Sequence, residues 1–390
     1  MKNLSHDMAE LQKHTAASQE LNKWVTSAQA FFLLSAAFEC GIIDALRVPS
    51  TSAQIAAGTK IDAARIEDIL LALEAHDIAM RQDGLYQLTP SLALLASPTA
   101  IQPLASMLRN ASVKMRTLQA IASSKDIFTA QPPEDILTMA GGMGVSSLSP
   151  ARTIMGLLLG QNFPELKELW EKGARHLEVG CGVGNNLLQV ATTYPKVTAV
   201  GIEIDSLTAT EAERRAGVLG VSDRVEVRTM DAGDLQDVAA FDTAQWSQFF
   251  FPEVSRPRVL AALLRAMKPG GYVQMPLLPA VPPDFAMRRR DMLRMTWHAL
   301  RSEPFFALPF LKDYIGATAA YRRQEKRHAT IQRLLYGLWG VHVRTAPELR
   351  EEMERTGFHV VRAVSMPATQ LSVSRGLMLT QKPMVHEVPQ

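Results

Sequence analysis

Apolar residues recur with two different periods along the chain. From Leu21 to Leu46 they keep the spacing of one face of an α-helix, and residues 51–90 predict two short helices, a turn at Asp83–Gly84 and a strand. This order of elements is typical of a winged helix. Residues 1–105 are therefore predicted to form a helical, winged-helix domain, and residues 106–170 to form linking helices.

Short strands and helices alternate through the second half of the chain, residues 171–390. The helix that follows the first strand is expected to end before Pro195, and a turn is expected at the Lys-Pro-Gly-Gly run of residues 268–271. Alternation of this kind predicts an α/β fold with a doubly wound, mostly parallel sheet. Its ligand crevice should lie at the carboxyl ends of the strands.

Residues 281–344 interrupt this alternation and predict a helical cap over the substrate end of the crevice. From Asp284 to Arg344 the chain has twelve Lys and Arg against five Asp and Glu. This positive charge could attract an acidic substrate, or it could belong to a solvated helix face. The apolar residues that share predicted helix faces are Leu293, Trp297 and Leu300, and Ile331, Leu335 and Leu338.

Net charge and cysteine content narrow the class of protein. The formal net charge of the 390-residue chain is +2, which gives no global sign of a nucleic-acid or membrane-surface partner. Cys40 and Cys181 lie far apart and lack metal-ligand spacing, so we expect no disulfide and no metal, and predict a cytoplasmic protein. The most apolar stretch is too short to span a bilayer.

The helix of the winged-helix pattern that would enter a DNA groove is acidic. Such a surface would be repelled by phosphates, so a packing or dimerisation role is favoured over DNA binding. Its only basic residue is Arg65, and its acidic residues are Asp62, Glu67, Asp68, Glu74 and Asp77.

The run HLEVGCGVGNN, residues 176–186, predicts a strand, a tight glycine turn and a helix. Glycines let backbone amides approach a ligand, and the helix N-terminus adds partial positive charge. Similar loops bind dinucleotides. Here, however, Glu178 comes two residues before Gly180, where it would repel a phosphate and suit an ammonium group.

Further acidic residues follow the next strands at fixed places. Glu203 ends the second predicted strand, where a carboxylate accepts hydrogen bonds from ribose hydroxyls. Asp231 follows the third strand, and Asp205 is expected to cap the helix that begins near Ser206. The ligand indicated has an amine, a ribose and a base but no phosphate, and S-adenosylmethionine is such a molecule.

The runs AAFECGIIDAL and AQIAAGTKIDAARIEDILLALEAHDIAMRQDGLYQLTP, together with the glycine loop and its acidic residues, resemble the small-molecule O-methyltransferases related to the plant caffeate and bacterial polyketide enzymes. The resemblance implies a class I methyltransferase fold with bound S-adenosylmethionine, and a homodimer formed through the N-terminal domain. The cofactor contacts that it implies are Glu178, Gly180, Gly182, Gly184, Glu203, Asp231, Ala232 and Gln245.

The chain departs from this family where a histidine acts as general base after the fourth strand, because Phe249 or a neighbour takes that position. One interpretation is that the acceptor carries its own nucleophile, such as an amine, an acidic phenol or an activated carbon. Otherwise another group is the base, and the candidates are Glu253, His328 and His342, with His298 as a weaker one. The residues expected to line the substrate pocket are Trp246, Phe249, Phe250 and Trp297.

We therefore predict a methyltransferase that acts on a small, aromatic or acidic metabolite. The missing histidine leaves open whether oxygen, carbon or nitrogen accepts the methyl group. Two other functions stay open: a rearrangement or decarboxylation assisted by the sulfonium, and a cofactor-binding regulator that uses the winged helix on DNA.

Overall fold

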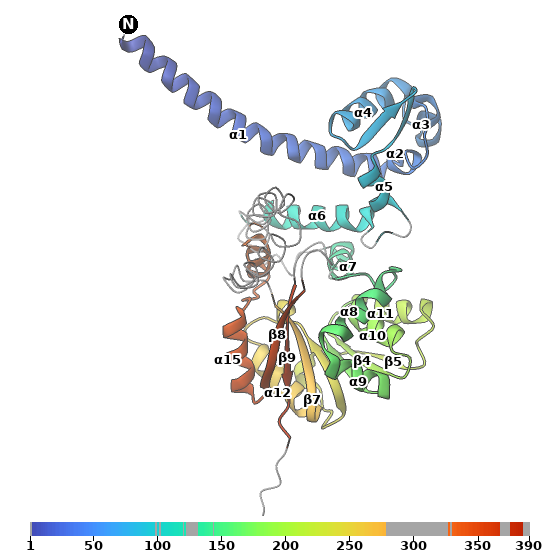
Figure 1. Cartoon of the computed structure of the whole chain (residues 1–390), viewed down its shortest axis with the longest axis vertical. Coiled ribbons are helices and arrows are strands. Elements are labelled where there is room, and N and C mark those ends of the chain that lie inside the picture. Colours follow the sequence, from blue (N-terminus) through green and yellow to red (C-terminus); the bar gives the residue numbers. More distant parts are fainter. Residues whose placement is uncertain are drawn as a thin grey trace, which may run out of the picture. The chain divides into compact units, whose positions relative to one another are not determined.

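The structure is a computed structural model, and it describes residues 2–97, 100, 103–119, 121, 132–142, 144–277, 327, 330–366 and 375–384 (Figure 1). Contacts within the chain define two units, Met1–Arg109 and Asn110–Gln390, and each is described by itself. Within the described residues, no helix is long and apolar enough to cross a membrane.

The N-terminal unit packs short helices around a two-stranded hairpin. The turn between the strands lies at Asp83 (φ 51°) and Gly84 (φ 79°), and this pair of positive φ angles is typical of a hairpin turn that matches strand twist. Its elements are α1 (Lys2–Glu39), α2 (Ile42–Ala45), α3 (Ser52–Thr59), α4 (Ala63–Ala75), β1 (Ala79–Gln82), β2 (Leu85–Leu88), α5 (Pro90–Ala96) and the start of α6 (Leu104–Gln119).

Local signals explain where the helices of this unit begin. The Thr51 and Gln54 side chains form a capping box at the start of α3, and Asp62 accepts hydrogen bonds from the first backbone amides of α4. Glu67 accepts a hydrogen bond from the Tyr86 hydroxyl at 2.9 Å, so α4 is tied to the hairpin. Two of the acidic residues of this segment, Asp62 and Glu67, thus stabilise the fold of the N-terminal unit.

The C-terminal unit contains a seven-stranded sheet with the order β5-β4-β3-β6-β7-β9-β8. The strands β5, β4, β3, β6 and β7 are parallel, whereas β9 runs antiparallel to both β7 and β8. The predicted doubly wound, mostly parallel sheet is therefore confirmed. The strands are β3 (Arg175–Val179), β4 (Thr198–Glu203), β5 (Val225–Thr229), β6 (Phe241–Trp246), β7 (Met267–Leu277), β8 (His359–Met366) and β9 (Arg375–Gln381).

Helices cover both faces of this sheet, and side chains of one strand alternate between the two cores. Met378 of β9 packs into the core under α12 and α15, while its neighbours Leu377 and Leu379 pack with α9 and α10. Besides the end of α6 and a helix over residues 330–338, the described helices of this unit are α7 (Pro133–Gly141), α8 (Arg152–Asn162), α9 (Pro164–Lys172), α10 (Asn185–Thr193), α11 (Ser206–Val218), η2 (Ala232–Asp234), η3 (Gln248–Phe250), α12 (Arg256–Ala266) and α15 (Ala346–Thr356).

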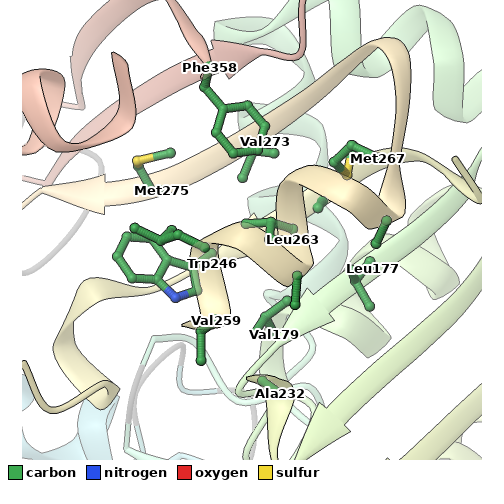
Figure 2. Close-up of a cluster of buried hydrophobic side chains, with 14 of the residues drawn as sticks. Leu177, Val179, Ala232, Trp246, Val259, Leu263, Met267, Val273, Met275 and Phe358 are labelled. Carbon is green, nitrogen blue, oxygen red and sulfur yellow. The ribbon is translucent and has the colours of Figure 1, made fainter. Parts of the chain in front are cut away.

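Figure 2 shows the core under α12, where Leu263 and Val259 meet Trp246 of β6 and Val273 of β7. All four side chains are buried. This core fixes the strand ends that lead into the cavity described below.

The turn predicted at residues 268–271 is placed differently. These residues belong to β7, which begins directly after α12, and the pairing of β7 with β6 shifts register between Phe241 and Thr243. Gly270 has a positive φ of 77°, which glycine adopts readily. The glycines therefore allow a bulge within β7 and do not form a turn before it.

Of the predicted cap, the structure describes residues 327 and 330–344, and residues 330–338 form a helix. The expected apolar face of Ile331, Leu335 and Leu338 is met in part. Leu335 is buried, whereas Ile331 is 43% exposed, and Tyr336 and Trp339 complete the buried face. Gly340 (φ 69°) follows the helix, which therefore does not reach residue 342. Trp297, His298 and His328 lie outside the described residues.

Candidate functional site

A cavity of about 440 Å³ opens at the carboxyl ends of β3, β4, β5 and β6. This is the crevice that the alternating fold predicts. Among the described residues, the lining includes four carboxylates but no Lys, Arg or His. It is formed by Ile136, Met139, Ala140, Glu178, Gly180, Cys181, Gly182, Asn185, Asn186, Ile202, Glu203, Ile204, Asp205, Thr208, Met230, Asp231, Ala232, Phe249, Phe250, Phe251, Pro252, Ser255, Val259, Trp339 and Val341.

The glycine loop connects β3 to α10. Gly180 has a φ of 74°, and a Cβ added there would lie 3.2 Å from the ring of Phe251. Gly182 also lines the cavity, whereas a Cβ at Gly184 would meet Leu188 at 3.1 Å. Gly184 is thus required by the packing of α10, and the structure places it outside the lining where the sequence analysis expected a cofactor contact.

Glu178 is a buried carboxyl group beside this loop. Its Oε1 accepts hydrogen bonds from Nδ2 of Asn186 (3.3 Å) and Nε2 of Gln245 (3.5 Å). Its Oε2 is buried and has no hydrogen-bond partner among the described residues. Burial raises the pKa of Glu178 to about 8, and the negative charge of Glu203 adds to this effect. Gln245 therefore supports Glu178 from behind and does not itself line the cavity.

Glu203 ends β4 and is held by backbone amides. Its carboxylate accepts hydrogen bonds from the amides of Gly182 (2.7 Å), Ile204 (2.9 Å) and Asp205 (3.0 Å). Burial raises its pKa, and these three hydrogen bonds act against that effect. The Asp205 side chain accepts from the Thr208 amide at 2.8 Å, which makes it the N-cap of α11.

Asp231 and Ala232 line the far end of the cavity, after β5. One oxygen of Asp231 accepts a hydrogen bond from the Gly233 amide at 2.8 Å, and the other pairs with Arg258 of α12. A ligand amine at this carboxylate would share it with a guanidinium group. No local sequence pattern indicates Arg258, because its partner Asp231 is 27 residues away.

The opposite end of the cavity is apolar and largely aromatic. Phe249 stacks on Tyr336, with ring centroids 4.9 Å apart and an interplanar angle of 12°, and Tyr336 meets Trp339 edge to face. Phe249 and Phe250 line the cavity, as do Phe251 and Trp339, which the sequence analysis did not select.

Trp246 was expected at the pocket, and the structure places it in the core instead. It is fully buried among core side chains (Figure 2) and does not line the cavity. Its ring centroid lies 5.8 Å from that of Phe251. The guanidinium of Arg256 lies 5.1 Å from its ring centroid. Trp246 thus supports the cavity wall from behind.

The candidate bases that the structure describes lie outside the lining. Glu253 is exposed and forms an ion pair with Arg344. His342 is also exposed, beyond the end of the helix over residues 330–338. His328 lies outside the described residues. Among the described residues, no group of three His, Cys, Asp or Glu side chains could hold a metal.

Asn185, the first residue of α10, joins α7 to the glycine loop. Its Nδ2 donates to the carbonyl of Gly141 at 3.1 Å, and its Oδ1 accepts from Arg215 at 2.9 Å and from the Ser147 amide at 3.1 Å. In this way α7 contributes Met139 to the cavity. The sequence analysis assigned this region only as linking helices.

Comparison with known proteins agrees with this geometry. Residues 177–271 match the family model of the methyltransferase domain. The uncharacterised protein YjhP of Escherichia coli is 36% identical over 106 residues, which is 26% of this chain and 40% of YjhP. A tRNA (guanine-N(7)-)-methyltransferase of Microcystis aeruginosa is 32% identical over 113 residues, which is 25% of this chain and 53% of the relative. The chain thus spans about half or less of these two relatives.

Solved structures show the same fold over most of the chain. An O-methyltransferase from Nostoc punctiforme superposes with a TM-score of 0.65 and 14% identity, covering 92% of this chain and 97% of that one. PigF, solved with S-adenosylhomocysteine, has a TM-score of 0.59 and 19% identity, covering 94% and 99%. Residues 177–271 thus match a methyltransferase domain, and the chain has the class I methyltransferase fold that the resemblance implied.

Proposed function

We propose that this protein is an S-adenosylmethionine-dependent methyltransferase that acts on a small aromatic acceptor. The observation that carries the proposal is that the carboxyl side chains in the described lining of the cavity have no cation to balance them there. Glu178, Glu203, Asp205 and Asp231 line it, and none of the described lining residues is a cation. Dinucleotide cofactors bring a pyrophosphate, which this wall would repel, whereas an ammonium and a sulfonium group are attracted to it.

The residues present fit this cofactor. The unpaired Oε2 of Glu178 is a buried acceptor that lacks a donor, and an ammonium group would supply one. Glu203 is fixed at the end of β4, where a ribose would lie, and Asp231 and Ala232 stand where a base would lie. Gly180 and Gly182 line the cavity and present backbone to it without a side chain. When bound, S-adenosylmethionine supplies an electrophilic methyl group.

The aromatic end would bind and orient the acceptor. Phe249, Phe250 and Trp339 offer an apolar wall for a planar ring and exclude water from the transfer. Positioning of two reactants can supply roughly 7–11 kcal/mol of the barrier, whereas a general base is worth about 100- to 10,000-fold in rate. The described lining contains no histidine at this end. We therefore expect an acceptor with a ready nucleophile, such as an amine or an acidic phenol.

Calorimetry followed by a transfer assay tests the proposal. S-adenosylhomocysteine should bind the wild-type protein and NADH should not, and Glu203→Gln should weaken the binding of S-adenosylhomocysteine. With methyl-labelled S-adenosylmethionine and a panel of aromatic amines, phenols and acids, mass spectrometry should find label in a product. If S-adenosylhomocysteine binds but no label leaves the cofactor across the panel, methyl transfer is contradicted and a cofactor-assisted rearrangement or decarboxylation is favoured.

We also propose that the N-terminal unit forms a homodimer. In the single chain, α1 exposes large apolar residues that a partner could cover, among them Leu21, Trp24 and Phe32. Light scattering at micromolar concentration should give twice the chain mass of 42.9 kDa, and Trp24→Glu should shift the protein toward the monomer. A monomeric wild-type protein would contradict this role.

A further inference from the structure

Two chain segments that are far apart in sequence form the aromatic end of the cavity. Residues 249–252 follow β6 and carry Phe249 and Phe251, while residues 336–343 lie before α15 and carry Tyr336 and Trp339. The Phe249–Tyr336 stack crosses from one segment to the other. The shape of the wall therefore depends on how firmly the two segments are joined.

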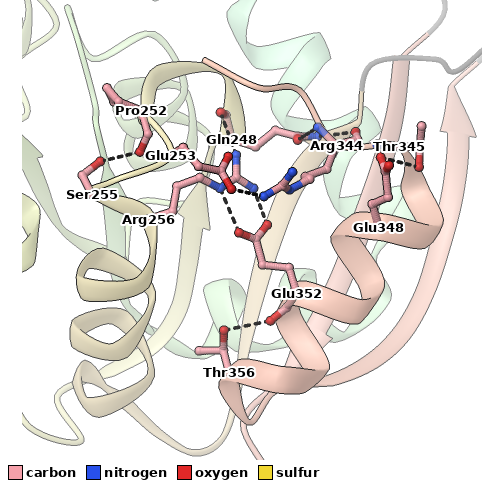
Figure 3. A network of polar contacts seen from close by, with 10 residues as sticks. All are labelled: Gln248, Pro252, Glu253, Ser255, Arg256, Arg344, Thr345, Glu348, Glu352 and Thr356. Carbon is pink, nitrogen blue, oxygen red and sulfur yellow. Dashed lines mark hydrogen bonds and ion pairs between the residues drawn. The ribbon is translucent and has the colours of Figure 1, made fainter. Parts of the chain in front are cut away.

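Gln248 joins them through its side-chain amide. Its Oε1 accepts a hydrogen bond from the Arg344 backbone amide at 2.8 Å, and its Nε2 donates to the Arg344 carbonyl at 3.4 Å (Figure 3). The side chain thus pairs with both backbone groups of one residue, as a neighbouring strand would. Gln248 is fully buried, so water cannot replace either hydrogen bond.

A buried ion pair holds Gln248 itself in place. Arg256, at the start of α12, donates to the Gln248 carbonyl at 3.4 Å and pairs with the carboxylate of Glu352 on α15. Its guanidinium also lies over the Trp246 ring. The backbone of Gln248 is therefore held by Arg256 of α12, and its side chain is held by the backbone of Arg344.

We propose that Gln248 is a positioning residue for the acceptor end of the cavity: its amide holds the segment that carries Phe249–Phe251 against the segment that carries Tyr336 and Trp339. The proposal rests on the proposed function of the cavity. Gln248 does not line the cavity, so it acts through the aromatic rings that it positions. These rings also meet the glycine loop, where a Cβ on Gly180 would approach the Phe251 ring to 3.2 Å.

The consequence for binding follows from this contact. If the wall is loose, a ligand that occupies the glycine loop must also order the wall. The apparent affinity then equals the intrinsic affinity multiplied by the fraction of molecules whose wall is already ordered. Losing both hydrogen bonds of a buried amide is enough to change a local opening equilibrium about tenfold.

Gln248→Met tests this, because methionine keeps the length and volume of glutamine and removes both hydrogen bonds. Hydrogen exchange should be about tenfold faster in peptides covering residues 246–252 and 336–345, and calorimetry should show S-adenosylhomocysteine binding weakened about three- to tenfold. Gln248→Glu keeps the oxygen that accepts from the Arg344 amide, so it should fall between Gln248→Met and wild type in both measurements.

Glu348→Ala is the matched control. Glu348 forms the capping box of α15 with Thr345, next to Arg344 but outside the Gln248 pairing. This variant should lower the melting temperature and loosen the start of α15, while the exchange of residues 246–252 and the affinity for S-adenosylhomocysteine stay within about twofold of wild type.

The outcomes separate the two proposals. If Gln248→Met lowers only the melting temperature, as Glu348→Ala does, Gln248 is merely structural and the positioning role is overturned. If Gln248→Met does not fold, the partial loss expected of Gln248→Glu decides in the same way. If wild-type protein does not bind S-adenosylhomocysteine, the cofactor assignment is contradicted, and exchange in the two segments still decides whether Gln248 joins them.

Discussion

Glu178 is expected to make the binding of S-adenosylhomocysteine depend on pH. Burial holds its pKa at about 8 in the free protein. A ligand ammonium group stabilises the ionised carboxylate, so binding below pH 8 requires the carboxyl group to lose a proton. Affinity should therefore rise as the pH rises toward 8.

The size of the effect follows from the pKa. A carboxyl group with a pKa of about 8 is ionised in about 1% of molecules at pH 6 and about 9% at pH 7. If only the ionised form binds the ammonium, the dissociation constant of S-adenosylhomocysteine should fall roughly tenfold between these pH values. Calorimetry in buffers of different ionisation enthalpy should show close to one proton released for each ligand bound at pH 7.

Two controls make this prediction specific. Glu178→Gln removes the titrating group, so its affinity should be lower at pH 7 and nearly independent of pH. The nucleoside 5′-methylthioadenosine has no ammonium group, so its binding to the wild-type protein should not follow the same slope. The reasoning is refuted if wild-type affinity for S-adenosylhomocysteine is constant from pH 6 to pH 7.5, or if the slope persists in Glu178→Gln.

Three further predictions concern other buried groups. Glu203→Ala should weaken S-adenosylhomocysteine binding by roughly 1.5–3 kcal/mol in calorimetry, as expected for the loss of a charged hydrogen bond, and unchanged affinity would mean that the ribose lies elsewhere. Burial lowers the pKa of His176 from 6.5 to about 4, so the unfolded chain binds more protons between these values and the free energy of unfolding should fall as the pH falls through this window. In urea denaturation, the free energy of unfolding of His176→Gln should depend less on pH between 6.5 and about 4 than that of wild type. Glu178 contributes with the opposite sign, but equally in both proteins, so its contribution cancels in the comparison. Parallel pH curves would contradict the lowered pKa of His176. Arg256→Met should lower the free energy of unfolding by about 3 kcal/mol because Glu352 is left unpaired, and a melting temperature equal to wild type would contradict a stabilising pair.

The sequence was sufficient for the parallel strands β3, β4, β5 and β6 because each of them is encoded locally. The glycine loop after β3, the carboxylates at the ends of β3 and β4 and the capped helix α11 all lie within a short stretch, Arg175–Val218, where periodicity and turn chemistry decide the structure. For the same reason Asp205 could be recognised as a helix cap before the fold was known.

The errors occur where contacts between distant residues decide the structure. Trp246 and Phe249 are both aromatic and three positions apart, so the sequence predicts a pocket position for each. Trp246 lies in the core instead, where it packs against α12 and Arg256. The approach of α7 to the cavity depends on Asn185, 44 residues beyond Gly141. Helix periodicity predicted a helix for residues 330–338 and the burial of Leu335, but it also placed Ile331 on the buried face, where Tyr336 packs against Phe249 instead.

The place of β9 in the sheet has a consequence for how the chain folds during synthesis. β9 is made after β8, yet it lies between β7 and β8. When β8 leaves the ribosome, β9 has not yet been synthesised. The edge of β7 is then unpaired, and pairing of β8 with β7 would be non-native. The nascent chain must therefore avoid pairing of the β7 and β8 edges with each other, or with another nascent chain, until residues 375–381 have been synthesised.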